Sequence, residues 1–395
     1  MNEQQKKPRV LVICDYYLPG YKSGGGMRTI VNMVERLQDQ YEFLIITRDH
    51  DGKLDTTPYT SVRINDWNRV GPSKVFYLSK EKVKMSELKR LILEVSPDLL
   101  YFNSFFSTLA IYVLNLRRAG RLGGIGVVLA PCGELSEGAL QLKSLKKKLF
   151  FIYAKILGLY RDIIWKASSD LEKEEIERYK GPGGRILIAP DLPPKSIFPD
   201  YSMGLKPEKI SGSVKMVFLS RFMRKKNFKW LLEIIDQTQG ELEIDIYGPL
   251  EDAGYWQECQ EIIDRLPARI RIAARGSIPH ESVLEVLVKY HFFILPTLGE
   301  NFGHVFLEAL AGGCPLVISD KTPWLELAEK GIGWDLPFET SRWIETIDRC
   351  IRMDAAEYAV LSENSRKFLV DWLADPGIEE STKMVLAETK AVSGK

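Results

Sequence analysis

The stretch HFFILPTLGENFGHVFLEALAGGCPLVISD, residues 291–320, decides the fold of this chain. It begins and ends with short apolar runs, 291–297 and 315–320, which are typical of strands. Between them, small and apolar residues predict a helix that starts near His304. Strands that are apolar throughout are buried on both faces, as in a parallel sheet covered by helices. The stretch therefore predicts a strand, a helix and the next strand of a parallel α/β sheet.

Apolar runs and helical patterns alternate in the same way along most of the chain. The other expected strands are 10–14, 43–47, 99–102, 126–131, 162–169 and 186–190, and then 214–220, 242–248 and 269–276. The first helix is expected to bury Met27, Ile30, Val31, Val34 and Leu37. The sequence thus predicts two doubly wound α/β domains. Such sheets bind ligands at the carboxyl ends of their strands, so we expect a cleft between the domains.

The length of 395 residues also favours two domains, since one core rarely serves more than about 250–300 residues. The segment 190–213 carries five prolines and little periodicity, which is typical of a linker. We expect an N-terminal domain at 1–190, a linker at 191–213 and a C-terminal domain at 214–372. A helical segment at 373–395 follows, for which a return to the N-terminal domain is one option.

Composition excludes several classes of function. The net charge of +1 gives no general attraction to nucleic acid. Five scattered cysteines and four scattered histidines lack metal-ligand spacing, so we expect reduced thiols and no metal site. The apolar run after Lys6 and Lys7 is too short for a signal peptide. No run reaches the about 20 apolar residues of a membrane span, and a cytoplasmic location is expected.

Three groups of residues could carry chemistry. The first is the loop of Gly24, Gly25 and Gly26, which follows the first strand and precedes a helix. Backbone N–H groups at such a position can bind an anion. The spacing does not match G-x-G-x-x-G, so a dinucleotide fingerprint is not indicated. An ordinary strand-to-helix loop is the alternative.

The second group is Arg221 and Lys226, between an apolar strand and an amphipathic helix. Cations at the start of a helix oppose its dipole, a cost that a bound anion would offset. Arg and Lys together can hydrogen-bond and neutralise a diphosphate. A solvated basic turn is the alternative.

The third group lies in the opening stretch, where Glu300 follows a strand and Gly303 permits a close approach of the backbone. Glu308 is one helical turn beyond His304, on the same face. A carboxylate can accept two hydrogen bonds from the vicinal hydroxyls of a sugar. The alternative is a capping Glu300 and a solvent-facing Glu308. Small residues around Glu308 argue against that alternative, because they suggest close packing there.

Glu300 and Glu308, with seven residues between them in PTLGENFGHVFLEALAGGCPLVISD, resemble the signature of retaining glycosyltransferases of family 4, which have the GT-B fold. Arg221 and Lys226 match the Arg-x4-Lys pair of that family, and Gly24–Gly26 matches its N-terminal glycine loop. The stretch TPWLELAEKGIGWDLPF, 322–338, resembles a subgroup from bacterial surface-polysaccharide clusters.

The resemblance implies transfer of a hexose, with retention, from a UDP- or GDP-linked donor and without a bound metal. Arg221 and Lys226 would hold the donor diphosphate, Glu300 the hexose hydroxyls and Glu308 the ribose. Backbone atoms would contact hexose and phosphate at Phe302, Gly303, His304 and Val305, and the base at 276–279, including Gly276 and Ile278. The implied acceptor is a glycan, polyprenyl-diphosphate-linked in our interpretation.

Two departures from the family pattern stand out. Many members carry a histidine near the transferred sugar where this chain has Gly133 and Glu134. The usual Asn-Gly at the linker entry is replaced by Asp191 and Leu192. An epimerase of the same fold and a non-catalytic protein that binds sugar nucleotides are the alternative functions.

Two further segments have open interpretations. Residues 143–160 mix five lysines with bulky apolar residues, Phe150 and Phe151 among them. This composition fits either a core helix with a charged edge or a face that binds the anionic inner surface of the plasma membrane. Asp49-His50-Asp51 contains the D-x-D pattern of some metal sites, but a surface loop or a contact with the acceptor is expected.

Overall fold

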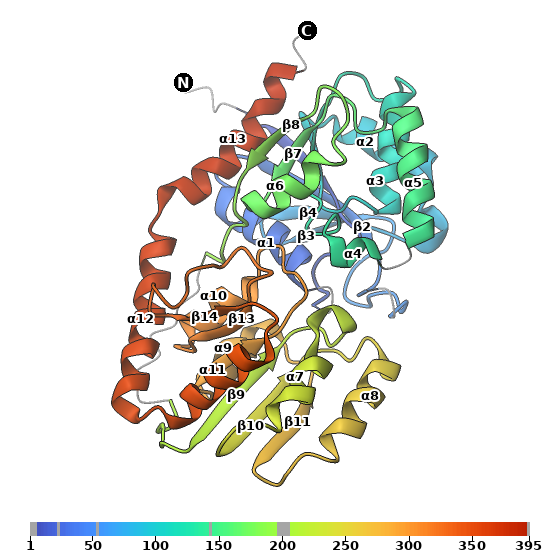
Figure 1. Cartoon of the computed structure of the whole chain (residues 1–395). Helices are drawn as coiled ribbons and strands as arrows, with labels where there is room; N and C mark the ends of the chain where they lie inside the picture. Colours follow the sequence, from blue (N-terminus) through green and yellow to red (C-terminus); the bar gives the residue numbers. More distant parts are fainter. Residues whose placement is uncertain (1–5, 22–23, 53–54, 142–143, 196–205, 393–395) are drawn as a thin grey trace. The chain divides into compact units, whose positions relative to one another are not determined.

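The computed structural model describes residues 6–21, 24–52, 55–141, 144–195 and 206–392. The chain folds into two compact units (Figure 1). Unit 1 comprises Met1–Lys195 and Pro376–Lys395, and unit 2 comprises Ser196–Asp375. The linker expected at 191–213 includes residues 196–205, which lie outside the described residues.

Unit 1 is built on an eight-stranded sheet in the order β3-β4-β2-β1-β5-β6-β7-β8. Its strands are β1 (Arg9–Ile13), β2 (Glu42–Arg48), β3 (Trp67–Val70), β4 (Ser73–Leu78), β5 (Leu99–Phe102), β6 (Gly126–Leu129), β7 (Ile164–Ala167) and β8 (Arg185–Ile188). All neighbours are parallel except β3 and β4, which form a hairpin at one edge. The six strands predicted in this half are all present, and the hairpin adds two that the sequence did not indicate.

Helices cover this sheet on both faces (Figure 1). They are α1 (Gly25–Leu37), α2 (Met85–Val95), α3 (Thr108–Arg118), α4 (Glu137–Gln141), α5 (Ser144–Leu157), α6 (Asp170–Glu177) and α13 (Pro376–Val392), with a 3-10 turn η1 (Lys80–Lys82). Side chains of α2, α3 and α5 join the sheet in one apolar cluster. The expected face of α1 is buried at Met27, Ile30, Val31, Val34 and Leu37.

Unit 2 is built on a six-stranded, fully parallel sheet in the order β11-β10-β9-β12-β13-β14. Its strands are β9 (Ser213–Leu219), β10 (Glu241–Tyr247), β11 (Ile270–Gly276), β12 (Phe292–Leu295), β13 (Leu316–Ser319) and β14 (Gly333–Leu336). Five of the six were predicted, and β14 was not. The predicted fold class, two doubly wound parallel α/β sheets, is confirmed.

The helices of unit 2 form two groups. One group contains α7 (Phe228–Ile235), α8 (Ala253–Ile263) and α11 (Thr340–Arg352), and the other contains α9 (Val283–Leu287), α10 (His304–Ala311) and α12 (Ala355–Leu373). Two 3-10 turns, η3 (Arg224–Lys226) and η4 (His280–Ser282), follow β9 and β11. A single large apolar cluster joins these elements around fully buried side chains such as Trp343 and Phe292.

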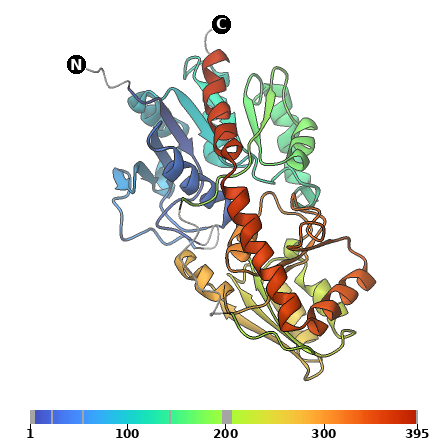
Figure 2. The same cartoon turned by 90° about the vertical axis from the view of Figure 1, so that its left-hand side faces the viewer.

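The C-terminal helices belong to different units. Helix α12 ends at Leu373 in unit 2, and α13 begins at Pro376, because proline is tolerated in the first turn of a helix but not in its interior. Helix α13 packs against β6 and β7 of unit 1 (Figure 2). Among the described residues, no helix has both the length and the apolar character needed to cross a bilayer.

Candidate functional site

Three of the residues predicted in unit 2, Arg221, Lys226 and Glu300, follow two adjacent central strands. The order of the sheet reverses between β9 and β12, which pair directly through Met216 with Phe292 and Val217 with Phe293. In open α/β sheets, ligands bind at the carboxyl ends of strands at such a reversal. Arg221 follows β9, and Glu300 follows β12. The topology therefore brings both residues to the position where a ligand is expected.

Lys226 and Glu300 form an ion pair across this position. Their side chains are 9% and 20% exposed. The backbone fixes the contact, because the N–H of Leu298 donates to the carbonyl of Lys225 (2.9 Å) and that of Glu300 donates to Lys321 (3.0 Å). The turn after β9 and the loop after β12 are thus tied together, although they are far apart in sequence.

The electrostatic environment of Glu300 identifies a cationic centre. Burial alone would raise the pKa of Glu300, but the positive charges of Lys226, Lys225 and Arg221 hold it below its ordinary value. The carboxylate therefore stays ionised at neutral pH. Sequence reasoning missed Lys225, whose neighbouring position in the basic run 224–226 was the available signal.

Arg221 is held more loosely than Lys226. Its guanidinium lies 3.4 Å from the carboxylate of Glu251, and its side chain is 42% exposed. An exposed ion pair of this length contributes little free energy, so the guanidinium can exchange Glu251 for another anion. Glu251 had no signal in the sequence that distinguished it from other surface carboxylates.

The start of α10 explains the need for glycine at Gly303. This residue precedes the helix with φ of 82°, in the left-handed region. A Cβ atom here would lie 2.4 Å from the ring of Phe306. The preceding Phe302 is buried, and its carbonyl accepts a hydrogen bond from the indole of Trp324 (2.6 Å). Glycine thus lets the chain turn sharply from β12 into His304 and Val305.

Glu308 lies beside the loop that follows β11. Its carboxylate is 2.9 Å from Nε2 of His280, and both side chains are partly buried. His280 begins η4, immediately after the predicted base-contacting stretch with Gly276 and Ile278. The structure therefore brings together the two regions assigned to ribose and base. Sequence reasoning missed His280, although it directly follows that stretch.

The close packing predicted around Glu308 occurs elsewhere. A Cβ atom on Gly312 would lie 2.9 Å from Leu287, and one on Gly313 would lie 2.6 Å from Ser362 of α12. The small residues of this segment thus serve the contacts of α10 with α9 and α12. They give no support to a special role for Glu308, which now depends on its position beside His280.

In unit 1 the glycine loop also lies at a reversal of strand order, between β1 and β5. Gly24 precedes α1 with φ of 73°, and no side chain caps this helix. The amide of Asn103, just after β5, donates to the carbonyl of Gly26 (2.7 Å). Gly24, Gly25 and Gly26 therefore occupy the ligand-binding edge of this sheet. The preceding Ser23 lies outside the described residues.

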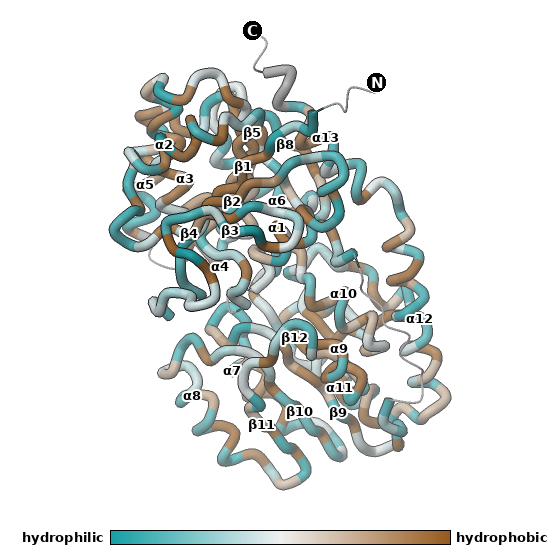
Figure 3. Tube along the Cα trace, turned by 180° about the vertical axis from the view of Figure 1, so that it is seen from behind, coloured by the Kyte–Doolittle hydropathy of each residue, from teal (hydrophilic) through white to brown (hydrophobic). Residues whose placement is uncertain are grey.

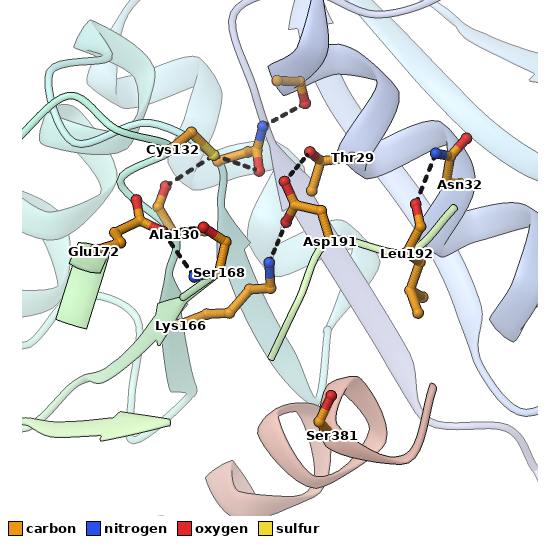
Figure 4. Close-up of polar contacts among 12 residues, drawn as sticks. Thr29, Asn32, Ala130, Cys132, Lys166, Ser168, Glu172, Asp191, Leu192 and Ser381 are labelled. Atoms are coloured by element: carbon orange, nitrogen blue, oxygen red, sulfur yellow. Dashed lines mark hydrogen bonds and ion pairs between the residues drawn. The ribbon is translucent and has the colours of Figure 1, made fainter. Parts of the chain in front are cut away.

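A buried polar network explains the departure at the linker entry (Figure 4). Asp191 forms an ion pair with Lys166 of β7, and the side chains of both are 4% exposed. The hydroxyl of Thr29 donates to the other carboxylate oxygen of Asp191 (2.8 Å). Burial opposes the charge on Lys166, but Asp191 holds the pKa of Lys166 above its ordinary value. The buried negative charge of Asp191 is thus compensated by the buried positive charge of Lys166 in the same unit.

One face of α1 holds the segment that follows Asp191. Thr29 contacts Asp191, the amide of Asn32 donates to the carbonyl of Leu192 (2.7 Å), and Arg36 donates to Pro193 (2.7 Å). These three side chains are spaced along one side of a helix. The helix that begins at the glycine loop therefore also fixes the end of the first long segment of unit 1.

Glu134 occupies the region where the family has a histidine. Its carboxylate accepts hydrogen bonds from the N–H groups of Phe105 (2.6 Å) and Phe106 (3.0 Å) and from the hydroxyl of Ser104. Burial nevertheless raises the pKa of Glu134 above its ordinary value. These contacts hold the loop between β5 and α3 in place.

One of the two expectations for Asp49-His50-Asp51, a surface loop, is wrong, because both aspartates are buried. The other, a contact with the acceptor, stays a prediction. Asp49 and Asp51 are 5% and 6% exposed. Nδ1 of His50 lies 2.9 Å from Asp49, and Asp51 accepts a hydrogen bond from the N–H of Tyr21 (2.8 Å). The buried position arises because these residues follow β2, one of the inner strands of the sheet, and fold back against the turn at 19–21.

A family model matches part of the chain. Residues 213–352, which lie in unit 2, match the model described as glycosyl transferases group 1. This range contains Arg221, Lys226, Glu300 and Glu308.

Curated relatives match part of the chain. It is 24% identical over 190 residues to the GtfA subunit of the UDP-N-acetylglucosamine–peptide N-acetylglucosaminyltransferase of Streptococcus parasanguinis, covering 47% of this chain and 32% of that protein. It is 28% identical over 129 residues to the GtfA subunit of Streptococcus agalactiae, covering 32% and 21%. The chain thus spans about a third or less of the length of these relatives.

Solved structures match along nearly the whole chain. Sucrose-phosphate synthase of Thermosynechococcus elongatus gives a TM-score of 0.70 at 16% identity, covering 98% of this chain and 100% of that one. HepE of Anabaena, in complex with UDP and glucose, gives 0.67 at 14% identity, covering 96% and 100%. WaaG, a glycosyltransferase involved in lipopolysaccharide biosynthesis, gives 0.64 at 11% identity, covering 98% and 100%. The chain therefore has the GT-B fold, and its residues 213–352 match the domain model of glycosyl transferases group 1.

Proposed function

We propose that this chain is a retaining glycosyltransferase of family 4 that moves a hexose from a nucleotide-diphosphate sugar to a glycan. The observation that carries the proposal is the cationic centre of Arg221, Lys225 and Lys226 around the ionised Glu300. It lies at the strand-order reversal of a domain that matches glycosyl transferases group 1. A centre that combines cations with one carboxylate suits a ligand with both phosphate and hydroxyl groups.

The cations would act on the leaving group. When the bond between the hexose and the donor phosphate breaks, negative charge gathers on the terminal phosphate oxygens. Lys226 is already oriented by Glu300, and the loosely held Arg221 can turn from Glu251 to the diphosphate. Cations that are in place before the charge develops stabilise the transition state at little reorganisation cost. These positive charges would neutralise the leaving diphosphate in place of a metal ion, so we propose no metal cofactor.

The remaining predicted residues would bind the rest of the donor. Glu300 would accept hydrogen bonds from hexose hydroxyls, and the backbone at the start of α10 would contact the hexose and phosphate. Glu308 would accept hydrogen bonds from the ribose, with His280 keeping its carboxylate in place. The backbone near Gly276 and Ile278 would border the base. Gly24–Gly26 in unit 1 would provide N–H groups for the donor phosphate.

We propose a UDP-linked donor over a GDP-linked one. The support comes from similar proteins: the GtfA subunits are named for UDP-N-acetylglucosamine, and HepE was solved with UDP-glucose. For the acceptor we propose a polyprenyl-diphosphate-linked glycan of a cell-surface polysaccharide. The stretch 322–338 and the fold likeness to WaaG, which is involved in lipopolysaccharide biosynthesis, favour this class.

A donor screen followed by product analysis tests the proposal. A ligand at 100 times its Kd stabilises a protein by about 2.7 kcal/mol, so thermal shifts should identify the nucleotide sugar. Release of the nucleoside diphosphate should then depend on an added glycan acceptor. NMR of the product should show the anomeric configuration of the donor.

Each alternative predicts a different result. An epimerase would convert the donor sugar without acceptor, and a binding protein would give a thermal shift without turnover. A β-linked product from an α-linked donor would contradict the retaining mechanism.

A further inference from the structure

Helix α5 presents a continuous apolar stripe to solvent. Leu145, Leu149, Ile152 and Ile156 are 71%, 60%, 57% and 78% exposed. Their spacing of four, three and four residues places them on one side of the helix. Most surface apolar residues of a protein are scattered singly, whereas a continuous exposed stripe marks an interaction surface. We call these four residues the α5 stripe.

The opposite side of α5 is fixed to unit 1. Ala154 is buried, and the ring of Phe151 stacks on Tyr179 with centroids 4.4 Å apart. Phe150 and Phe151 both contact the ring of Phe105. Of the two interpretations that the sequence left open for this segment, these two phenylalanines follow the core helix, because they pack against the unit. The side of the helix that faces solvent is instead formed by the α5 stripe.

Helix α5 lies beside α3 at the margin of unit 1 in both views (Figures 1 and 3). The hydroxyl of Tyr153 donates to Asn115 of α3 (2.7 Å), and Arg118 donates to the carbonyl of Leu157 (3.1 Å). These contacts hold the helix at both the middle and the end. The orientation of the stripe is therefore set by the fold.

Lysines border the stripe on both sides. At 100° per residue, Lys146 lies on one side of the stripe, and Lys148 and Lys155 lie on the other. All three are exposed. The helix carries no aspartate or glutamate between residues 144 and 157. Lys147 belongs to the inner side, since it donates to the carbonyl of Ala139 (2.5 Å) and lies over the ring of Phe106.

We propose that the α5 stripe docks on the surface of an anionic lipid bilayer, with the helix axis in the plane of the interface. The apolar side chains enter the boundary between headgroups and acyl chains, and the lysines contact lipid phosphates. A second copy of this chain fits less well, because the lysine rows of two such helices would meet without any carboxylate to pair them. The proposal goes beyond the transfer reaction and does not depend on it.

Vesicle binding tests the proposal. The full chain is mixed with vesicles of phosphatidylcholine alone or with added phosphatidylglycerol, and bound protein is measured by sedimentation. We expect binding to the mixed vesicles that weakens as salt is added. Leu149→Ser/Ile152→Ser/Ile156→Ser should abolish it. Each lysine near an anionic surface contributes about fivefold, so Lys146→Glu/Lys148→Glu/Lys155→Glu should weaken binding on the order of 100-fold or more.

Two matched controls accompany these variants. Lys80→Glu/Lys82→Glu/Lys84→Glu makes the same change of charge at exposed lysines elsewhere in unit 1. Val360→Ser/Val370→Ser removes apolar residues that are 58% and 55% exposed on α12. Both should bind vesicles like the wild type. Because all substituted side chains are exposed, melting curves should be unchanged.

Three results would overturn the proposal. One is the absence of binding to mixed vesicles, and another is equal loss in the control variants. The third is a dimer in light scattering that the stripe variant converts to a monomer, which would identify a second copy as the occupant. Transfer to a water-soluble acceptor, measured in parallel, should be unaffected by the stripe variants. A failure of the transfer reaction is thereby distinguished from a failure of docking.

Discussion

The charged side chain of Lys226 is almost completely buried, and it forms an ion pair with Glu300. For Arg221 and Lys226 the sequence left two alternatives, an anion site and a solvated basic turn. The structure shows that the two residues differ in burial and in the strength of their ion pairs. Arg221 is exposed and weakly paired, whereas Lys226 is buried and compensates the mostly buried carboxylate of Glu300.

This difference leads to a prediction for two alanine variants. Arg221→Ala should lower the rate of transfer by about 10²–10³, the cost of losing one preorganised contact to developing charge. Its melting temperature should stay unchanged, because an exposed ion pair is worth only about 0–1 kcal/mol. Lys226→Ala should lose as much activity and also up to about 3 kcal/mol of stability, since Glu300 is left without its main partner. Steady-state kinetics beside urea unfolding measures both quantities.

Arg224→Ala is the matched control, because Arg224 is in the same turn and pairs with surface carboxylates. It should keep both activity and stability. If Arg221→Ala is folded and retains wild-type transfer, the diphosphate is not bound at this turn.

Glu308 leads to a second prediction at the scale of a residue. Its carboxylate, held 2.9 Å from His280, is proposed to bind the ribose, which does not change during the reaction. An interaction that stabilises the ground state and the transition state equally affects only substrate binding. Its loss therefore raises KM and leaves kcat unchanged. Glu308→Ala should therefore raise the KM for the donor more than it lowers kcat. A variant with normal KM and reduced kcat would instead move Glu308 to the reacting centre.

At the scale of elements, the sequence indicated the inner strands because they are apolar on both faces. It did not indicate β14, whose short GWDL segment contains glycine and a carboxylate. It also missed the hairpin of β3 and β4. Strand β3, WNRV, has no apolar run, whereas β4 is the exception among the inner strands, because its run Val75–Leu78 is apolar and buried and was still missed. Strands β3 and β14 lie at the edges of their sheets. An edge strand needs to bury only one face or none, so these two sequences can lack the apolar run on which the prediction relied.

The sequence predicted which residues belong to the site, but it did not predict which of them are in contact. Resemblance to a family suggested Arg221, Lys226 and Glu300, but Lys226 and Glu300 are 74 residues apart. Their contact depends on β9 and β12 being neighbours, and strand order follows from packing of the whole sheet. The contact between Glu308 and His280 likewise depends on how two loops meet, which residue patterns do not specify.

The buried pair of Lys166 and Asp191 leads to a prediction about how elements are joined. Lys166→Met leaves a buried carboxylate without its counter-ion and should cost about 3–5 kcal/mol. Lys166→Met/Asp191→Asn should recover most of this, because asparagine is neutral and can still accept the hydrogen bond from Thr29. The free energy of unfolding in urea measures both. Lys180→Met, which removes an exposed ion pair with Glu177, should cost less than about 1 kcal/mol.

Equal stability of the single and the double variant would contradict this account. It would mean that the lysine is needed for its packing and not for its charge. The contacts of Thr29, Asn32 and Arg36 would then hold the segment after Asp191 without help from the ion pair.

At the scale of the whole molecule, the two units should respond to acid in opposite directions. In unit 2, burial lowers the pKa of His291 to about 4, and its Nδ1 accepts a hydrogen bond from the N–H of Lys215 (3.0 Å). The unfolded chain binds this proton first, at a pKa of about 6.5. Unit 2 is thus most stable above about pH 6.5. It loses at most about 1.4 kcal/mol per pH unit as the pH falls toward 4.

Unit 1 contains buried carboxyl groups with the reverse effect. Burial raises the pKa of both Glu134 and Glu172, in spite of the N–H groups that donate to them. The folded state then takes up these protons at a higher pH than the unfolded state does. Their contribution to stability is complete below the ordinary pKa of 4.5 and is lost as the pH rises through the folded pKa. Mild acid should therefore strengthen unit 1 while it weakens unit 2.

Hydrogen exchange resolves the two units, whereas a single melting curve would average them. Exchange is followed at about pH 7.5 and about pH 5 and corrected for the intrinsic rate of each peptide. We expect peptides from β9 and β12 to lose protection at the lower pH and those from β6 and β7 to keep or gain it. His291→Asn, whose amide oxygen can replace Nδ1 as the acceptor, should remove most of the loss of protection in unit 2 alone.

If protection falls in both units together, or if His291→Asn has no effect, the buried histidine is not the source of acid sensitivity. Two units that respond oppositely would show that each sheet, with its own core, sets its own stability.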